Sequence, residues 1–236
     1  MQRSDGQQWQ AALRGWHLGG DELPDDADPR YQAAAVSLPL LLASASPRRR
    51  EMLERVGVAL EVRPADVDED PHPREDPAAY VARIARAKAL AVKRRPGQWV
   101  LAADTTVTLG GAILGKAATP EEATVMVKQL AGKVHQVMTA FTIIGDIDDA
   151  PLQRDGLVAS DVVVVDMDDE LVAQYVASGE WRGKAGAYAI QGIAAALVRE
   201  VRGSVTNVIG LPLVEVLEAL RAVGAPAGNL SAGVAA

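Results

Sequence analysis

The chain has 236 residues, a formal net charge of -7 and no cysteine. An acidic chain is a poor partner for a nucleic-acid polymer, and the lack of thiols excludes disulfides and cysteine nucleophiles. The sequence shows no membrane span and its first residues lack a secretory signal, so we expect a cytoplasmic protein without nucleic acid or membrane as partner. The length allows one large α/β domain or two small ones.

Residues 1–36 are predicted to form an N-terminal extension. Trp9, Leu13 and Trp16 recur at helical spacing, which indicates a short amphipathic helix that packs against the body or a second subunit. We expect the main domain to span 37–224 and the C-terminal segment 225–236 to be a flexible tail.

The stretch from Leu38 to Leu53 predicts an anion-binding site. The apolar run Leu40–Ala43 is typical of a buried strand, a serine-rich turn follows, and Pro47 marks the first residue of a helix. Three arginines, residues 48–50, come next. A helix N-terminus offers free N–H groups and a positive dipole end to an anion, and arginine adds charged bidentate donors. From these residues alone, a solvated basic helix end is the alternative.

A short strand at Ala59–Val62 is followed by an acidic, proline-rich loop and a long helix. The helix is expected to begin after Asp76 and to end near Pro96. Lys88 lies on its apolar stripe, as defined by the i, i+3, i+4, i+7 rule. A lysine in that place either extends past the edge of the core or reaches into a site. The pattern leaves both possibilities open.

The next apolar strand is predicted at Trp99–Ala103, and Asp104 stands at its end. An aspartate there is either a turn cap or a site carboxylate, and this residue alone does not decide between them. A hairpin is predicted downstream, in which Val107–Leu109 pairs with Ala112–Leu114 across two glycines.

Residues 110–116 match the GxxxxGK pattern of a P-loop. We reject a P-loop, because Ala117 stands where a metal-binding serine or threonine is needed and the next helix begins only at Pro120. Lys116 is therefore expected just past a hairpin strand.

The second half of the chain is predicted to alternate strands and helices. The expected elements are a strand from His135 to Ile144, an acidic turn at 146–151, a strand at Ser160–Asp166, a helix at Asp168–Ala177, a strand at Leu197–Val201 and a helix from Pro212 to Gly224. Between residues 183 and 192 the glycine-rich sequence GKAGAYAIQG is too irregular for either element and indicates a site loop. The three histidines have no ligand-like spacing, so we expect no histidine metal site.

Taken in order, these segments resemble the Maf family of nucleoside triphosphate pyrophosphatases. The likeness rests on separate motifs between about Leu38 and Leu213: LASASPRRREML, AADTTV, ILGKAATPEEA with LAGKVHQVMTA, and KAGAYAIQG with GSVTNVIGLPL. The resemblance implies an α/β fold related to that of the inosine triphosphatase group. It implies a long bent mixed β-sheet with flanking helices and a cleft between two lobes.

The resemblance also implies which residues act in catalysis. Asp104 would be the general base, with Lys88 and Lys116 as further cationic catalytic residues. A divalent metal cation, Mg²⁺ or Mn²⁺, would bind near Asp104 and Asp68. Asp68 is shorter than the glutamate that is usual at its position.

Substrate contacts follow from the same resemblance. Phosphate contacts fall on Ser44, Arg48 and Arg49. The positions associated with base selection are those of Arg48, Thr105 and Gln191. These expectations depend on one proposition, that cations and acids far apart in the chain converge on a single hollow of polyphosphate size.

The implied activity is hydrolysis of a nucleoside triphosphate between its α and β phosphates, which gives the monophosphate and pyrophosphate. The triplet IQG at the end of the glycine-rich loop resembles the subfamily that acts on dTTP and UTP. Two alternatives stay open: a pyrophosphatase for 7-methyl-GTP or other modified nucleotides, and a non-catalytic nucleotide-binding regulator of septum formation. A homodimer is expected by analogy.

Overall fold

The computed structural model describes residues 38–229. The predicted N-terminal extension, with its amphipathic helix, and the last part of the predicted tail lie outside these residues. Within the described range no helix is long and apolar enough to cross a membrane.

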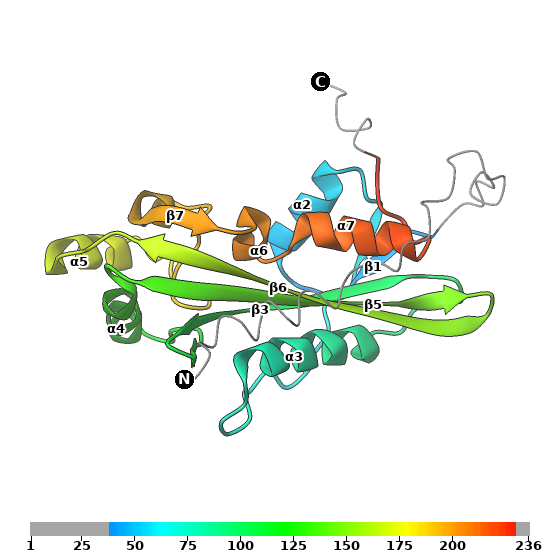
Figure 1. Cartoon of the computed structure of the whole chain (residues 1–236), viewed down its shortest axis with the longest axis horizontal. Coiled ribbons are helices and arrows are strands. Elements are labelled where there is room, and N and C mark those ends of the chain that lie inside the picture. The colour runs from blue at the N-terminus through cyan, green and yellow to red at the C-terminus, as the bar shows by residue number, and fades with distance from the viewer. Residues whose placement is uncertain (1–37, 230–236) are drawn as a thin grey trace, which may run out of the picture. The chain divides into compact units, whose positions relative to one another are not determined.

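A mixed seven-stranded sheet organises the described chain, with the strand order β2-β1-β3-β5-β6-β7 and with β4 paired to β3. β1 is parallel to β2 and β3, and the other pairs are antiparallel. Figure 1 shows β5 and β6 as the longest strands of the sheet. This arrangement confirms the predicted α/β fold class. The strands are β1 (Leu40–Leu42), β2 (Leu60–Val62), β3 (Val100–Leu109), β4 (Ala112–Leu114), β5 (Val134–Ile147), β6 (Ala150–Val164) and β7 (Val198–Arg202).

Helices flank the sheet. In Figure 1, α3 lies on one face, α2, α6 and α7 lie on the other, and α4 and α5 lie together near one end of β5 and β6. The helices are α2 (Pro47–Arg55), α3 (Pro77–Ala91), α4 (Pro120–Leu130), α5 (Asp169–Ala177), α6 (Val205–Ile209) and α7 (Leu213–Ala222), with a 3₁₀ turn η2 (Ile193–Leu197) before β7.

The helix starts follow from local chemistry, as predicted. Proline opens α2, α3 and α4, where its missing N–H would have no helical partner. The Asp76 carboxylate accepts the first free N–H groups of α3, and the Thr119 hydroxyl accepts the N–H of Glu122 in α4. α3 ends at Ala91, earlier than expected, because Val92 turns to an extended backbone and packs into the core.

Three strands, β3, β5 and β6, are longer than the sequence pattern predicts. β3 does not end before Asp104 but continues to Leu109, because β5 pairs with it from Val100 to Thr108. β5 and β6 likewise extend through most of the predicted acidic turn. The connection is only Asp148-Asp149, both at positive φ, which aspartate tolerates better than most residues and which suits a tight hairpin. The short helix α6 was not predicted.

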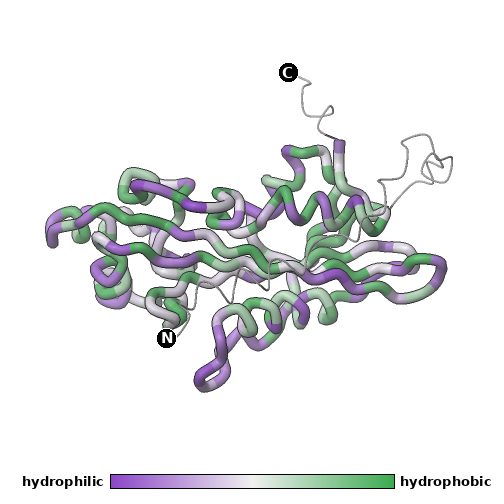
Figure 2. Tube along the Cα trace, viewed as in Figure 1, coloured by the Kyte–Doolittle hydropathy of each residue, from purple (hydrophilic) through white to green (hydrophobic). Residues whose placement is uncertain are grey.

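The core lies on both faces of the sheet. One buried cluster joins β1 and β3 to α2 and α7, and includes Phe141 and Ala225. A second joins α4 and α5 to the segment around Ala187. Figure 2 shows the loop before α3 as hydrophilic, as its acidic sequence predicts, and the sheet centre as largely apolar. The site described next opens between these two clusters, at the cleft that the resemblance predicts.

Candidate active site

A cavity of about 370 Å³ collects most of the predicted site residues. It lies between the start of α2, the centre of β3 and the glycine-rich loop. The charged side chains that line it are Arg48, Arg49, Lys88, Lys116, Lys184, Glu69 and Asp104. Five cations therefore face two carboxylates, although the chain as a whole is acidic. The predicted convergence on one hollow is confirmed, and its charge favours a polyanionic ligand.

The cavity forms where β3 lacks a strand partner on one side. β1 pairs with β3 at Val100 and Leu101, and β4 pairs with it from Val107 onward. Within the described chain, no strand covers this edge between those two contacts. Side chains from both faces of β3, Asp104 on one and Thr105 on the other, therefore reach the same cavity.

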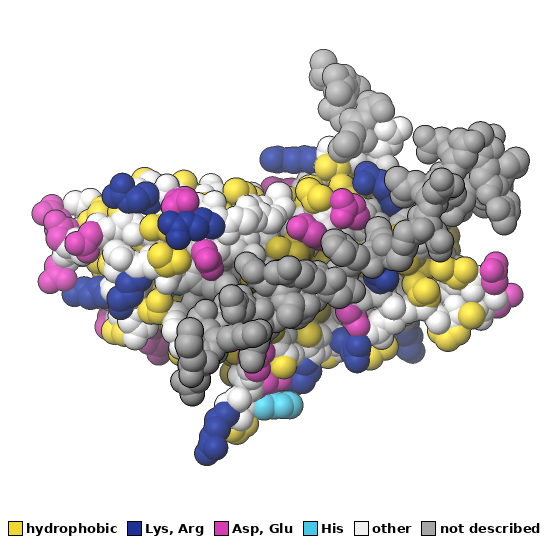
Figure 3. Space-filling model, in the orientation of Figure 1, with side chains coloured by type: hydrophobic (Ala, Val, Ile, Leu, Met, Phe, Trp, Pro, Cys, Tyr) yellow, Lys and Arg dark blue, Asp and Glu magenta, His cyan; other side chains and the backbone are white. Residues whose placement is uncertain are grey.

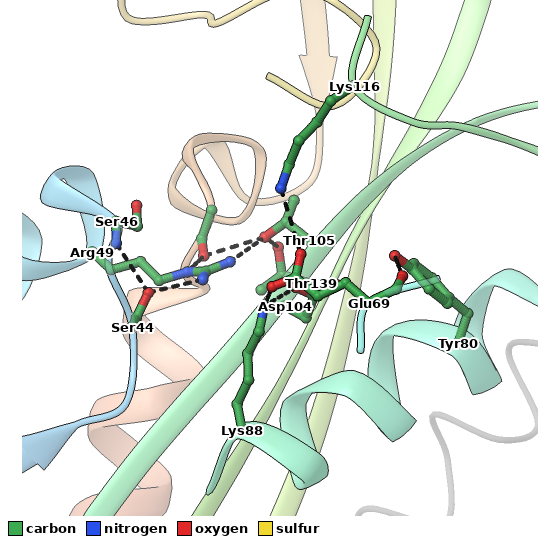
Figure 4. Close-up of polar contacts among 11 residues, drawn as sticks. Ser44, Ser46, Arg49, Glu69, Tyr80, Lys88, Asp104, Thr105, Lys116 and Thr139 are labelled. Atoms are coloured by element: carbon green, nitrogen blue, oxygen red, sulfur yellow. Dashed lines mark hydrogen bonds and ion pairs between the residues drawn. The ribbon is translucent and has the colours of Figure 1, made fainter. Parts of the chain in front are cut away.

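Asp104 lies in an ion-pair group with two lysines and a glutamate (Figure 4). Lys88 Nζ is 2.7 Å from Asp104 Oδ1 and 2.6 Å from Glu69 Oε1, and Lys116 Nζ is 3.4 Å from Glu69 Oε2. Figure 4 shows Lys88 and Lys116 approaching from opposite directions. Lys88 is buried and extends from the packed face of α3 into the site, which decides between the two possibilities left open by the sequence.

Glu69, which sequence reasoning missed, takes the place expected for Asp68. Asp68 is exposed, does not line the cavity, and accepts the N–H of Asp70 within its own loop. The Tyr80 hydroxyl donates to the carbonyl of Glu69 at 2.9 Å, which fixes the backbone so that the Glu69 side chain faces the lysines. Burial acts to raise the pKa of Glu69, but its bonds to Lys88 and Lys116 outweigh burial and lower the pKa.

The two predicted phosphate-binding arginines differ in their surroundings. Arg49 is buried and donates to the carbonyl of Gly210 at 2.7 Å, to Ser44 Oγ at 3.2 Å and to Thr105 Oγ1 at 2.9 Å. It therefore links α2 to β3 and to the segment after α6. Among the described residues, Arg48 makes one hydrogen bond through its side chain, from Nε to the carbonyl of Ile209 at 3.3 Å. Its other donors are left for a ligand in the cavity.

The hydroxyl of Thr105 belongs to a polar chain that runs into the core. Its Oγ1 lies 2.8 Å from Thr139 Oγ1, and Thr139 donates to the carbonyl of Asn207 at 3.1 Å. Thr139 has a single proton, which it gives to Asn207, so the Thr105 hydroxyl accepts from Arg49 and donates towards Thr139 or towards the more distant carbonyl of Gly210 at 3.4 Å. Thr105 can offer a ligand only an acceptor lone pair. The same chain holds α6 in place, because the Asn207 amide donates to the carbonyl of Val137 at 3.0 Å.

The glycine-rich loop is fixed at several points. Ala185 forms a β-bridge with Lys116, and the N–H of Gly186 donates to the carbonyl of Leu114 at 3.1 Å. Tyr188 Oη lies 2.7 Å from Nε2 of the buried His135. This anchoring holds Gln191 at the exposed rim of the cavity.

The cavity offers oxygen ligands for a hard cation. Glu69 and Asp104 are its two carboxylates, and among the residues described no group of three or more histidine, aspartate or glutamate side chains is placed to hold a metal alone. Mg²⁺ is commonly bound by one or two carboxylates together with substrate phosphates. The residues present therefore fit a cation that is shared with a polyphosphate.

Comparison with known proteins identifies the family. The family model described as Maf-like protein matches residues 39–223, which is most of the chain. The chain belongs to the Maf family. This confirms the resemblance stated from the motifs.

Two relatives of the Maf chain are each named dTTP/UTP pyrophosphatase. One, from Anaeromyxobacter dehalogenans (strain 2CP-1 / ATCC BAA-258), is 50% identical over 187 residues, which cover 79% of this chain and 95% of the relative. Another, from Geobacter sulfurreducens, is 44% identical over 191 residues, covering 79% and 97%. A solved HAM1 protein from Coxiella burnetii is 21% identical, covers 53% of this chain and 73% of its own, and has a TM-score of 0.34, too low to add weight.

Proposed function

We propose that this Maf-family protein hydrolyses dTTP and UTP between the α and β phosphates, releasing the nucleoside monophosphate and pyrophosphate. The observation that carries the proposal is the placement of Asp104 beside Lys88 and Glu69 inside a cavity dominated by cations. Phosphoryl transfer depends mostly on positioning and on charge stabilisation, and this cavity supplies both. The names of the relatives support the choice of substrates.

Asp104 is assigned the role of general base. Its carboxylate is held by Lys88 through Oδ1, which orients it, and its other oxygen can accept the proton of an attacking water. Lys116 and Arg48 would stabilise the charge that develops on the departing pyrophosphate. Glu69 and Asp104, with substrate phosphate oxygens, would hold a divalent cation such as Mg²⁺ or Mn²⁺, which lowers the pKa of bound water and neutralises phosphate charge.

The selection of the base is assigned to Thr105 and Gln191. Thymine and uracil share an edge on which an N–H donor lies between two carbonyl acceptors. Thr105 can only accept from a ligand, and the Gln191 amide can donate as well as accept, so the two can pair with that edge. A cytosine or purine presents a different pattern of donors and acceptors.

The proposal is tested by measuring pyrophosphate release over a panel of canonical and modified triphosphates with Mg²⁺ and with Mn²⁺. We expect dTTP and UTP to be the preferred substrates. A preference for 7-methyl-GTP would contradict the pyrimidine assignment. Tight binding of triphosphates without turnover would instead favour the regulator of septum formation.

The variant D104N tests the assignment of the base. We expect it to bind dTTP nearly as tightly as the wild type and to lose turnover by about 1,000-fold or more, because the amide cannot accept the proton. Binding is measured by calorimetry and turnover by pyrophosphate release. Retained release by D104N would rule out Asp104 as the base.

We also propose a homodimer and a cytoplasmic location. Sedimentation of the full chain tests the first, and fractionation of the source cells tests the second.

A further inference from the structure

Lys184 lines the cavity, and the proposed mechanism assigns no role to it. It lies in the glycine-rich loop between Gly183 and Ala185, and all three residues line the cavity. Its backbone is fixed, because its N–H donates to the carbonyl of Trp181 at 3.2 Å and its carbonyl accepts the N–H of Ala187 at 3.1 Å. In the part of the chain that the structure describes, its ammonium group makes no hydrogen bond or ion pair.

Arg48 lines the same cavity as Lys184 and is close enough for its charge to act on the Lys184 ammonium group. Burial and the charge of Arg48 lower the pKa of Lys184, and Glu180 opposes them only weakly. The Glu180 carboxylate is engaged elsewhere, by the N–H of Ile193 at 2.6 Å. Arg48 is itself half-buried, and burial lowers its pKa too. Two cations therefore line one cavity, and among the described residues no carboxylate is hydrogen-bonded to either of them.

The other cations of the cavity are already satisfied. Lys88 is paired with Asp104 and Glu69, Lys116 is paired with Glu69, and Arg49 donates to three protein oxygens. Like charges in a partly desolvated site repel unless an anion lies between them. Because thymine and uracil are uncharged, the base of the substrate cannot neutralise the charges of Lys184 and Arg48. The negatively charged phosphates of the substrate can do so.

We propose that Lys184 and Arg48 together bind the β and γ phosphates, the part of the substrate that leaves as pyrophosphate. This inference rests on the proposed function. The group of Asp104, Glu69 and Lys88 serves the attacked α phosphate, and the pair holds the phosphates that are not attacked. The start of α2 lies at the same wall through Ser46 and Pro47, and its free N–H groups favour the same anion.

Product inhibition of the full-length enzyme tests the proposal. For K184Q we expect the inhibition constant of inorganic pyrophosphate to rise by about 10- to 100-fold, as for the loss of a charged hydrogen bond. The inhibition constant of dTMP and the preference for dTTP over dCTP should not change. K184R should restore most of the affinity for pyrophosphate, because it keeps the charge.

The matched control is R182Q. Arg182 directly precedes the glycine-rich loop and does not line the cavity, and its guanidinium lies 4.7 Å from the centre of the Trp181 ring. It should behave as the wild type towards both products. The proposal is overturned if K184Q is inhibited by pyrophosphate as strongly as R182Q. It is also overturned if K184Q loses affinity for dTMP instead, since Lys184 would then contact the nucleoside or the α phosphate.

Calorimetric titration of inorganic pyrophosphate into the wild type and K184Q separates this inference from the proposed function, because binding requires no turnover. A wild type that hydrolyses no triphosphate refutes the proposed function. If it still binds pyrophosphate and K184Q does not, the assignment of the pair stands. If both bind pyrophosphate equally, the inference fails whatever the activity.

Discussion

Glu69 and Asp68 are adjacent carboxylates with opposite surroundings. Glu69 lies between two lysines in the cavity, whereas Asp68 faces solvent and bonds only to its own loop. They carry the same charged group and differ in length by one methylene, so a large difference between them in catalysis is expected to come from their positions. This pair therefore gives a matched test at the scale of single residues.

We predict that E69Q lowers turnover of dTTP by about 100- to 1,000-fold, because the variant lacks a carboxylate that balances two lysines and that would hold the proposed metal. D68N should stay near the wild-type rate. The measurements are pyrophosphate release and, independently of activity, Mn²⁺ binding in the presence of a non-hydrolysable triphosphate. Equal effects of the two substitutions would show that Glu69 has no special role.

At the scale of elements, β5 and β6 form the support for the site, and two glycines let aromatic rings lie across them. A Cβ atom built on Gly156 of β6 would lie 2.2 Å from Cζ of Phe141, and one on Gly145 would lie 2.1 Å from the Trp99 ring. Both rings belong to the buried cluster beneath α7. The glycines are therefore needed for close packing and not for a positive φ.

We expect G156A to destabilise the protein by about 1–3 kcal/mol, the usual range for overpacking a core. The control is G115A, because a Cβ at Gly115 meets nothing within 4 Å and its φ is not positive. Unfolding in urea measures both. A G156A variant as stable as G115A would mean that Phe141 can move aside without loss.

His135 of β5 connects the sheet to the glycine-rich loop through Tyr188. Burial lowers the pKa of His135 from 6.5 to about 4, so the ring is neutral in the folded protein near neutral pH. The unfolded chain takes up a proton at this ring near pH 6.5. Between these two values the unfolded state binds more protons, so stability must fall as the pH falls.

We predict that this ring makes the wild type roughly 2 kcal/mol less stable at about pH 5 than at about pH 7.5, since one pKa unit corresponds to about 1.4 kcal/mol. H135Q keeps a polar group near Tyr188 without a titrating ring. The pH dependence of its unfolding free energy should be smaller by that amount. If the unfolding free energies of the wild type and H135Q depend on pH in the same way, the prediction that His135 is buried and neutral is wrong.

At the scale of the whole molecule, charge is distributed unevenly. Acidic residues outnumber lysine and arginine by 31 to 24 over the chain, yet cations prevail in the cavity. On the face shown in Figure 3, acidic and basic side chains of the described residues are interspersed, without a continuous basic surface. This charge distribution suits a small polyanion that binds in the cavity.

A non-hydrolysable dTTP analogue should therefore raise the unfolding temperature, with a stabilisation of about 2.7 kcal/mol at 100 times its dissociation constant. Its affinity should fall as salt is added, because screening weakens the attraction between phosphates and the cavity. Thymidine, which has no phosphate, is the control and should show little salt dependence. The same salt dependence for both ligands would show that the cavity charges do not bind phosphate.

The sequence by itself determined the elements whose causes are local. Pro47, Asp76 and Thr119 mark helix starts through caps that involve only neighbouring residues, and the apolar run at Leu40 predicts β1. The motifs were sufficient to identify the family. The same motifs were also sufficient to predict most of the charged residues that line the cavity, because each motif contains a charged or polar side chain of the site.

Only the tertiary structure decided what depends on contacts between distant segments. β3 continues past Asp104 because β5 pairs with it, and no local signal reports that pairing. Glu69, not Asp68, faces the lysines because Tyr80 of α3 holds its carbonyl. The proposed role of Lys184 depends on the nearby charge of Arg48, a residue more than a hundred positions away in the chain. Local sequence specifies caps and turns, whereas burial and charge pairing are set only when distant segments come into contact in the folded protein.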